Sequence, residues 1–348
     1  MKIIDLFSGA GGLSLGFEKS GFNTVLAIDK WKDAIETFNF NHTNSVGTTI
    51  DIHDFSNDDI KKYKNEITGI IGGPPCQGFS LVGTRDTNDP RNSLYIEYVR
   101  FVDQIRPHFF VLENVSGLLS LQKGKYKDDI INRFSDLGYN VNFKLLTASD
   151  YGVPQSRKRV FFIGLKKDIF NDTYFNFDQL EFQDIVSTKK AMSDLPTPIN
   201  NNEFIKYDKP AINSFQELMR NNSEGVYNHQ ITNHTSQTIE IISQVPDGGG
   251  IKDLPEELYK VRNYNNAFRR MNSNLPSNTI DCGHRNYFHY KENRVPTVRE
   301  SARIQSFPDN YVFKGSKTSQ YTQVGNAVPP LLSETIAQQI KKLITQHN

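Results

Sequence analysis

Residues 2–12, KIIDLFSGAGG, decide the fold. Lys2–Leu6 has the apolar character of a short strand, and the glycines after it predict a tight turn leading into a helix at residues 13–20. A strand followed by a glycine-rich turn and a helix brings backbone N–H groups close to a ligand. The spacing is not Gly-x-Gly-x-x-Gly and no phosphate-binding lysine follows, so the turn alone leaves nucleotide binding and a merely tight turn equally open.

Short apolar runs alternate with helix-length segments through the first half of the chain. Further strands are predicted at residues 24–28, 67–71, 108–112, 141–146 and 160–165, and helices at residues 31–39, 92–105 and 126–137. This alternation predicts an α/β fold with a doubly wound, mostly parallel sheet. Such sheets bind ligands at the carboxyl ends of their strands.

The chain has 348 residues, enough for two domains of about 150 residues each. The alternation fades after residue 168, and residues 171–260 are polar, rich in asparagine and irregular. An amphipathic helix that begins at Pro330 is expected to return to the first domain. We therefore predict a ligand-binding domain at residues 1–180, a smaller irregular domain at 181–321 and a returning segment at 322–348.

The composition excludes several classes of protein. With 37% hydrophobic and 23% charged residues, the chain is neither disordered nor fibrous. No apolar run approaches the ~18 residues of a membrane span, and Asp5 interrupts what would be the core of a signal peptide, so we expect a cytoplasmic protein without membrane contact. Two cysteines, Cys76 and Cys282, are too few for a disulfide framework or a zinc site, and no metal is expected.

The formal net charge is +1, which indicates no particular partner. Residues 260–303 are locally basic, with nine Lys/Arg against three Asp/Glu. Such a segment could contact phosphates or form an ordinary solvated face, and charge alone does not separate the two.

Residues 72–80, GGPPCQGFS, place Cys76 on a loop directly after a predicted strand. The two prolines fix the backbone, and the glycines allow a substrate to approach closely. A thiolate in this position is favoured as a nucleophile over a small buried hydrophobe. No histidine stands nearby, which counts against a cysteine protease.

Three carboxylates stand at predicted strand ends. Asp29 ends the second strand, where dinucleotide folds place an acceptor for ribose hydroxyls, and Asp51 could accept from an adenine amine or simply end a strand. Glu113 follows an apolar strand, where desolvation disfavours its ionised form and suits proton transfer. A Glu that only caps a turn is the competing interpretation.

Two arginines open the last predicted strand. Strand alternation would put Arg157 and Arg159 on one face, where they suit a phosphate or a carbonyl oxygen with developing charge, although a solvated basic edge fits equally. Residues 323–330, QVGNAVPP, are predicted to form a turn before the C-terminal helix.

Taken in order, these motifs resemble the cytosine-5 DNA methyltransferase family of bacterial restriction–modification systems. The stretch TVRESARIQSFP at residues 297–308 strengthens the resemblance, which covers residues 1–165 and about 268–340. It implies the S-adenosylmethionine-dependent methyltransferase fold, with a target-recognition domain in the variable middle region. One departure is Lys30, with Trp31 one place later, where some members carry an aromatic residue directly after the ribose acid.

The resemblance also implies S-adenosylmethionine as the cofactor. Asp29 would hold its ribose, and Asp51 with Ile52 its adenine. The full set of expected cofactor residues is Phe7, Gly9, Gly11, Gly12, Asp29, Asp51, Ile52, Pro75, Leu94 and Asn326.

For catalysis, the resemblance implies that Cys76 attacks C6 of a cytosine flipped out of duplex DNA. Glu113 would bond N3 and the exocyclic amine, and Arg159 the carbonyl oxygen, with Arg157 nearby. Asn326 would hold the loop that carries Gln77 and Ser80. The expected DNA contacts are Gln77, Ser80, Arg269 and Arg270.

The expected partner is double-stranded DNA, with a cognate restriction endonuclease acting on the same site, and the enzyme is expected to be a monomer. A transfer RNA cytosine-5 methyltransferase and a catalytically inactive cofactor- or DNA-binding regulator remain as alternatives.

Overall fold

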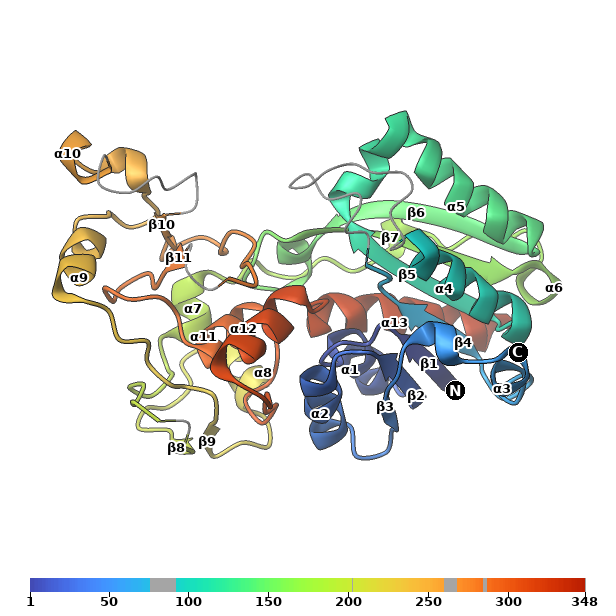
Figure 1. Ribbon diagram of the computed structural model, residues 1–348, viewed down its shortest axis with the longest axis horizontal. Helices are drawn as coiled ribbons and strands as arrows, with labels where there is room; N and C mark the ends of the chain where they lie inside the picture. The colour runs from blue at the N-terminus through green and yellow to red at the C-terminus, as the bar shows by residue number, and fades with distance from the viewer. Residues whose placement is uncertain (76–91, 202, 260–267, 284–286, 348) are drawn as a thin grey trace. The chain divides into compact units, whose positions relative to one another are not determined.

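The computed structural model describes residues 1–75, 92–201, 203–259, 268–283 and 287–347 (Figure 1). Cys76, Gln77 and Ser80 lie outside these residues. The chain divides into two compact units. The first comprises residues 1–147, 158–181 and 332–348, and the second residues 148–157 and 182–331.

These units differ from the predicted domains at two places. Residues 148–157 belong to the second unit, because Ser277 N–H donates to the carbonyl of Pro154 and Ser156 N–H to that of Ser277, at 2.9 and 2.8 Å. Residues 322–331 also belong to it. That the second unit reads a target stays a prediction.

The first unit is built on a seven-stranded sheet with the order β3-β2-β1-β4-β5-β7-β6. All neighbours pair in parallel except β7, which is antiparallel to both β5 and β6. The predicted, mostly parallel sheet is therefore confirmed. The strands are β1 (Lys2–Leu6), β2 (Asn23–Asp29), β3 (Gly47–Thr49), β4 (Gly69–Gly72), β5 (Phe109–Val115), β6 (Tyr139–Thr147) and β7 (Lys158–Lys166).

The direction of winding reverses between β1 and β4, which are neighbours in the sheet. The last residue of β1, Leu6, lies in register with Ile28 of β2 on one side and Gly72 of β4 on the other. The loops after these strands therefore leave the sheet side by side. A doubly wound sheet binds its ligand at such a switch point.

Helices cover both faces of this sheet. The described helices of the first unit are α1 (Gly12–Lys19), α2 (Lys32–Asn41), α3 (Asn57–Lys61), α4 (Asn92–Ile105), α5 (Lys125–Asp136), α6 (Lys167–Phe170) and most of α13 (Pro330–His347), with 3₁₀ turns η1 (Ile52–Asp54), η3 (Ser116–Gly124) and η5 (Phe177–Gln179). The helix predicted from Pro330 packs against α1, since the Ser333 hydroxyl donates to the carbonyl of Leu13 at 2.6 Å.

Side-chain alternation along the strands separates two cores. On one face, Tyr98 of α4 and Phe134 of α5 pack with Phe110 of β5 in a fully buried cluster. On the other, Phe17 of α1 stacks on Phe109 at 6.2 Å between ring centroids. Successive residues of β5 thus face opposite layers, as the strand period requires.

The second unit has short elements and much irregular chain. Its described elements are η4 (Ala148–Tyr151), α7 (Thr188–Met192), β8 (Ile205–Lys206), α8 (Ser214–Arg220), β9 (Gly225–Val226), α9 (Ser236–Ser243), η6 (Ile251–Asp253), α10 (Glu256–Tyr259), β10 (Arg269–Arg270), β11 (Tyr287–Phe288), α11 (Val298–Ile304) and α12 (Lys317–Asn326). A small apolar cluster that includes Ile242 and Phe288 supports α9 and β11.

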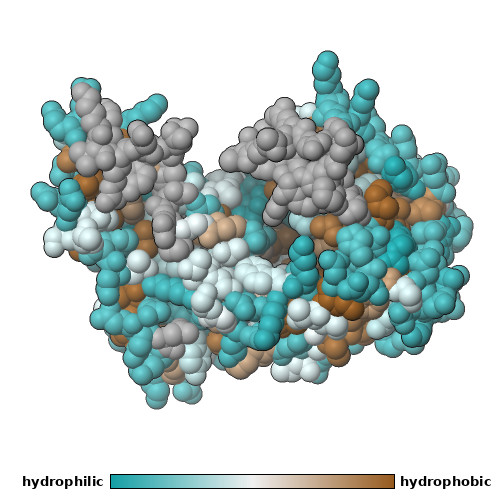
Figure 2. Space-filling view, in the orientation of Figure 1, coloured by the Kyte–Doolittle hydropathy of each residue, from teal (hydrophilic) through white to brown (hydrophobic). Residues whose placement is uncertain are grey.

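On the face in Figure 2, hydrophobic residues form separate patches among hydrophilic ones. Within the described residues, no helix has both the length and the hydropathy needed to cross a membrane.

Candidate active site

The turn after β1 has the geometry of a ligand cradle. Phe7, Gly9 and Gly11 all have positive φ angles, of 61°, 52° and 86°. Glycine adopts such angles without strain, whereas a phenylalanine rarely does. Ser8 N–H donates to the carbonyl of Ile28, which ties the turn to the end of β2, and α1 begins at Gly12. A Cβ at Gly9 would meet no atom within 4 Å, so the backbone there faces open space that a ligand can occupy.

Asp29 organises the neighbouring loop. Its two carboxylate oxygens accept from Gly9 N–H and Trp31 N–H, each at 2.9 Å. Burial raises the pKa of Asp29, and the two backbone donors partly offset that rise. Each oxygen keeps a second lone pair, so the carboxylate can still accept from hydroxyl groups beside the turn.

Asp5 is a buried acid to which the sequence patterns assign no role in the site. It lies on β1 with its side chain buried against α1, where the Ser14 hydroxyl donates to one carboxyl oxygen at 2.6 Å. The other oxygen is buried and has no hydrogen-bond partner among the residues that the structure describes. Burial raises the pKa of Asp5 to about 8. In the sequence, the only indication of this buried acid is its position within the mostly apolar stretch KIIDL.

Asp51, Ile52 and Leu94, three more of the expected cofactor residues, belong to the first unit, whereas Asn326 belongs to the second. Asp51 is half-exposed and accepts from both N–H and the ring nitrogen of His53, which lowers its pKa. Ile52 and Leu94 are buried in the same cluster as Leu6. Ile52 therefore acts mainly as packing beneath the predicted adenine site.

The segment after β4 approaches Glu113 closely. A Cβ at Gly73 would come within 2.7 Å of a carboxylate oxygen of Glu113, so any side chain here would displace that carboxylate. Asn114 then donates its side-chain amide to the carbonyl of Pro74 at 2.9 Å. The backbone that leads to Pro75, and on toward Cys76, is thus fixed by the end of β5.

Glu113 and Arg159 form an ion pair at the ends of adjacent strands. Arg159 Nε lies 2.8 Å from Glu113 Oε1, and their side chains are 15% and 12% exposed. The pair places a hydrogen-bond acceptor beside a hydrogen-bond donor at the strand ends.

Arg157 differs from Arg159. β7 begins at Lys158, so the strand alternation that would put the two guanidiniums on one face does not reach Arg157. Arg157 belongs to the second unit, is 1% exposed and donates from Nη2 to the carbonyl of Gly325 at 2.7 Å. This contact suits a residue that holds the Gly325–Asn326 backbone in place.

Asn326 is exposed at the end of α12, and its side-chain oxygen accepts from the Cys282 thiol at 2.8 Å. The prediction of a turn across residues 323–330 was wrong for its first half, because residues 323–326 are the last turn of α12. Only residues 327–329 connect the two helices.

Arg270 does not fit the predicted contact with DNA phosphates. It is 6% exposed, and its five N–H donors bond the carbonyls of Val245, His289, Glu292 and Ile242 and the side chain of Asn293. Its guanidinium is therefore fully used within the unit. Arg269, in contrast, is exposed.

Part of the basic excess of residues 260–303 is buried, although Arg269 and Lys291 are exposed, and Lys260, Arg262 and Arg285 lie outside the described residues. Arg294, Arg299 and Arg303 are at most 5% exposed and are bonded within the second unit. Arg294 pairs with Glu300 through two hydrogen bonds at 2.7 and 2.8 Å, and Arg303 pairs with Asp194 and Asp309. The solvated-face and phosphate interpretations both fail for these residues.

Comparison with known proteins decides the family. The profile of C-5 cytosine-specific DNA methylases matches residues 1–342. The chain belongs to this family. It is 42% identical to the Type II methyltransferase M.DdeI of Desulfomicrobium norvegicum, covering 98% of this chain and 88% of that one. It is 38% identical to M1.HphI of Haemophilus parahaemolyticus, with coverage of 99% and 88%.

Solved structures agree with this family. A prophage-encoded E. coli protein proposed to be a DNA modification methyltransferase superposes with a TM-score of 0.85 at 29% identity, over 99% of both chains. The Dnmt2 methyltransferase of S. pombe shares the fold, with a TM-score of 0.61 at 17% identity. The predictions of family, fold and enzyme class are thus confirmed: the chain is a DNA (cytosine-5) methyltransferase.

Proposed function

We propose that this methyltransferase takes its methyl group from S-adenosylmethionine and modifies cytosine within one short sequence of duplex DNA. The observation that carries the proposal is the paired Glu113 and Arg159 at the strand ends, beside the backbone that leads to Cys76. An acceptor, a donor and a thiol are the groups that a cytosine ring needs for methylation at C5.

The turn after β1 supports S-adenosylmethionine as the methyl donor. The open face of Gly9 would admit its methionine part, and Asp29 would accept from its ribose hydroxyls. Asp51 and Ile52 would border the adenine, with Phe7, Gly11, Gly12, Pro75, Leu94 and Asn326 as the remaining proposed contacts. When bound, this cofactor supplies a sulfonium methyl group that a carbon nucleophile can take.

Cys76 would make cytosine such a nucleophile. Its thiolate adds to C6 and forms a C–S bond, which places negative charge on the O2–N3 side of the ring and electron density on C5. Glu113 delivers a proton to N3 and accepts from the exocyclic amine, and Arg159 donates to O2. After the methyl group has joined C5, a solvent water takes the C5 proton, and its electron pair forms the C5–C6 double bond as the C6–S bond breaks and releases the Cys76 thiolate. N3 then returns its proton to Glu113, which restores the ring and the enzyme.

The cytosine must leave the duplex before it can reach these groups, at a cost of a few kcal/mol of stacking and pairing. Gln77, Ser80 and Arg269 are proposed to contact the DNA, whereas Arg270 holds the second unit together. Arg157 and Asn326 are proposed to support the Cys76 loop.

By likeness to its Type II relatives, we further propose that the enzyme works in the cytoplasm as a monomer. It would protect DNA from an endonuclease with the same target.

Bisulfite sequencing of a plasmid from cells that express the chain tests the proposal, with Cys76→Ser as the matched control. Cytosines that resist conversion in one recurring sequence, and only with the wild-type chain, are expected. Complete conversion in both samples would contradict DNA methylation, and the same assay on transfer RNA would then test the alternative substrate.

A further inference from the structure

The 3₁₀ turn η1 of the first unit is held by one arginine from a distant helix. Arg100 lies on α4, and its Nη1 donates to the carbonyl of Phe55 at 2.8 Å. Its Nη2 donates to the carbonyl of Ile52 at 3.2 Å. Ile52 is the first residue of η1 and Phe55 is the residue that follows its last. A single guanidinium therefore bonds the backbone at both ends of the turn.

The guanidinium of Arg100 is itself fixed by its neighbours. Glu97, three residues earlier on α4, accepts from Nε at 2.8 Å and also from Nη2. The side-chain oxygen of Asn57 accepts from Nη1 at 2.9 Å. The side chains of Arg100 and Glu97 are only 22% and 15% exposed. Because the donors of a guanidinium form a rigid fork, these bonds fix its position and its plane relative to α4.

The turn that Arg100 holds carries the two residues proposed to border the adenine. Asp51 caps η1, and its carboxylate accepts from His53 N–H at 3.1 Å. Ile52 is buried in the apolar cluster of the first unit. The position of the Asp51 carboxylate thus depends on the backbone of η1, and that backbone depends on Arg100. The methyl-transfer chemistry assigns no role to Arg100.

We propose that Arg100 is a positioning residue that makes the cofactor site select the adenine amine. The inference rests on the proposed function, which puts the adenine of S-adenosylmethionine beside Asp51 and Ile52. A carboxylate only accepts hydrogen bonds, so Asp51 in a fixed position favours a base that presents an amine. Such a contact needs its supporting residues to hold it within about 0.5 Å. Arg100 would supply that support through η1, without touching the cofactor.

Calorimetry with two ligands tests this role. The ligands are S-adenosylhomocysteine, the demethylated cofactor, and its 6-deamino analogue, in which hydrogen replaces the adenine amine. Wild type should bind S-adenosylhomocysteine about tenfold more tightly than the analogue, the usual effect of a hydrogen bond to a charged group. Arg100→Met should bind S-adenosylhomocysteine about tenfold more weakly than wild type does, and the analogue almost equally well. The ratio of the two affinities should therefore fall toward one.

Steady-state kinetics on the DNA target that bisulfite sequencing identifies give a second readout. Arg100→Met should raise the KM for S-adenosylmethionine and leave kcat at saturating cofactor unchanged, because the lost contact is the same in the bound and transition states. If Arg100→Met fails to fold, Arg100→Lys replaces it. Lysine keeps the charge but lacks the fork, so the affinity ratio should narrow in this variant too.

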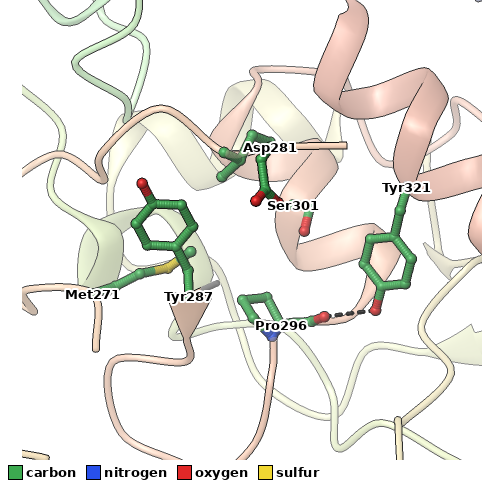
Figure 3. Close-up of a pocket in the computed structure, with 7 residues that line it drawn as sticks. Met271, Asp281, Tyr287, Pro296, Ser301 and Tyr321 are labelled. Atoms are coloured by element: carbon green, nitrogen blue, oxygen red, sulfur yellow. Dashed lines mark hydrogen bonds between the residues drawn. The ribbon is translucent and has the colours of Figure 1, made fainter. Parts of the chain in front are cut away.

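Two control variants separate positioning from general stability. Arg133→Met removes an arginine of the first unit that bonds Asp129, four residues earlier on α5. Tyr321→Phe removes a hydrogen bond in the second unit, in which the Tyr321 hydroxyl donates to the carbonyl of Pro296 at 2.6 Å (Figure 3). Both variants should keep the wild-type affinity ratio, even where Tyr321→Phe lowers the melting temperature.

The outcomes distinguish this proposal from the proposed function. If Arg100→Met keeps the wild-type ratio, or if Tyr321→Phe narrows it equally, Arg100 has no positioning role and the methyltransferase function stands. If wild type binds both ligands equally, Asp51 does not select the amine, and the proposal is also wrong. If wild type binds neither ligand, the proposed cofactor is wrong, and the role of Arg100 falls with it.

Discussion

Arg159 in the first unit and Arg303 in the second are both ion-paired arginines, but their surroundings differ. Arg159 keeps 15% of its side chain exposed and pairs with one carboxylate among the described residues, that of Glu113, while it also donates to the carbonyl of Lys158. Arg303 is fully buried between two carboxylates, Asp194 and Asp309, and also donates to the carbonyl of Ala191. The Glu113–Arg159 pair lies at strand ends, where a substrate can reach it. Arg303, Asp194 and Asp309 instead lie in the interior of the second unit, where apolar side chains would usually pack.

The difference shows what ionic groups do in each unit. The sheet of the first unit has large apolar clusters, so its charged pair can serve chemistry without holding the fold. The second unit has short elements and relies on buried arginines that bond backbone carbonyls and carboxylates. Substitutions in the two units should therefore affect activity and stability separately.

The largest expected effect is on activity, from Glu113→Gln. The amide cannot deliver the proton to N3, so kcat should fall by about 10²–10⁴-fold, the usual contribution of a general acid or base. The melting temperature should stay close to that of wild type. Glu66→Gln, which removes an exposed acid paired with Lys2, is the matched control and should methylate normally.

Arg303→Met tests whether the buried arginines stabilise the second unit. It leaves Asp194 and Asp309 buried without their cation, and breaking a buried pair in this way costs about 3–5 kcal/mol. Urea unfolding should show this loss. An Arg303→Met variant as stable as wild type would contradict the structural role assigned to the buried arginines.

Gly9→Ala should moderately lower both the free energy of unfolding and the affinity for the cofactor. The positive φ of 52° costs an alanine about 1–2 kcal/mol of unfolding free energy, although no atom lies within 4 Å of the new methyl group. If the cofactor occupies that space, the affinity for S-adenosylmethionine, measured by calorimetry, should fall by more than tenfold. An unchanged affinity would place the cofactor elsewhere.

Asp5 predicts an effect on stability that depends on pH. Its pKa rises from 3.8 when unfolded to about 8 when folded, so the folded chain holds a proton that the unfolded chain loses in this range. The contribution of Asp5 to stability is thus present below pH 4 and is lost as pH rises toward 8, by up to about 1.4 kcal/mol per pH unit. Asp5→Asn should remove this slope, and an identical slope in both proteins would contradict the assignment.

Local features could be predicted from the sequence because their causes are local. The glycines after Leu6 fix the turn, and Asp29 at a strand end lies where the chain order places it. Burial of charge could not be predicted, because Arg270 is bonded by segments as distant as Val245, and Arg303 needs Asp194 from another part of the chain in addition to the nearby Asp309. Residues 323–326 were placed in a turn because their helix begins at Lys317 in a polar stretch without an apolar period.

The central claim is that Cys76 attacks the cytosine while Glu113 and Arg159 hold it. The most direct test uses target DNA with 5-fluorocytosine at the methylated position. Fluorine at C5 cannot leave as a proton does, so the Cys76–C6 bond should persist after methyl transfer. The account predicts a denaturation-resistant complex with S-adenosylmethionine present, mapped by mass spectrometry to Cys76. No complex, or one attached to another residue, would contradict it.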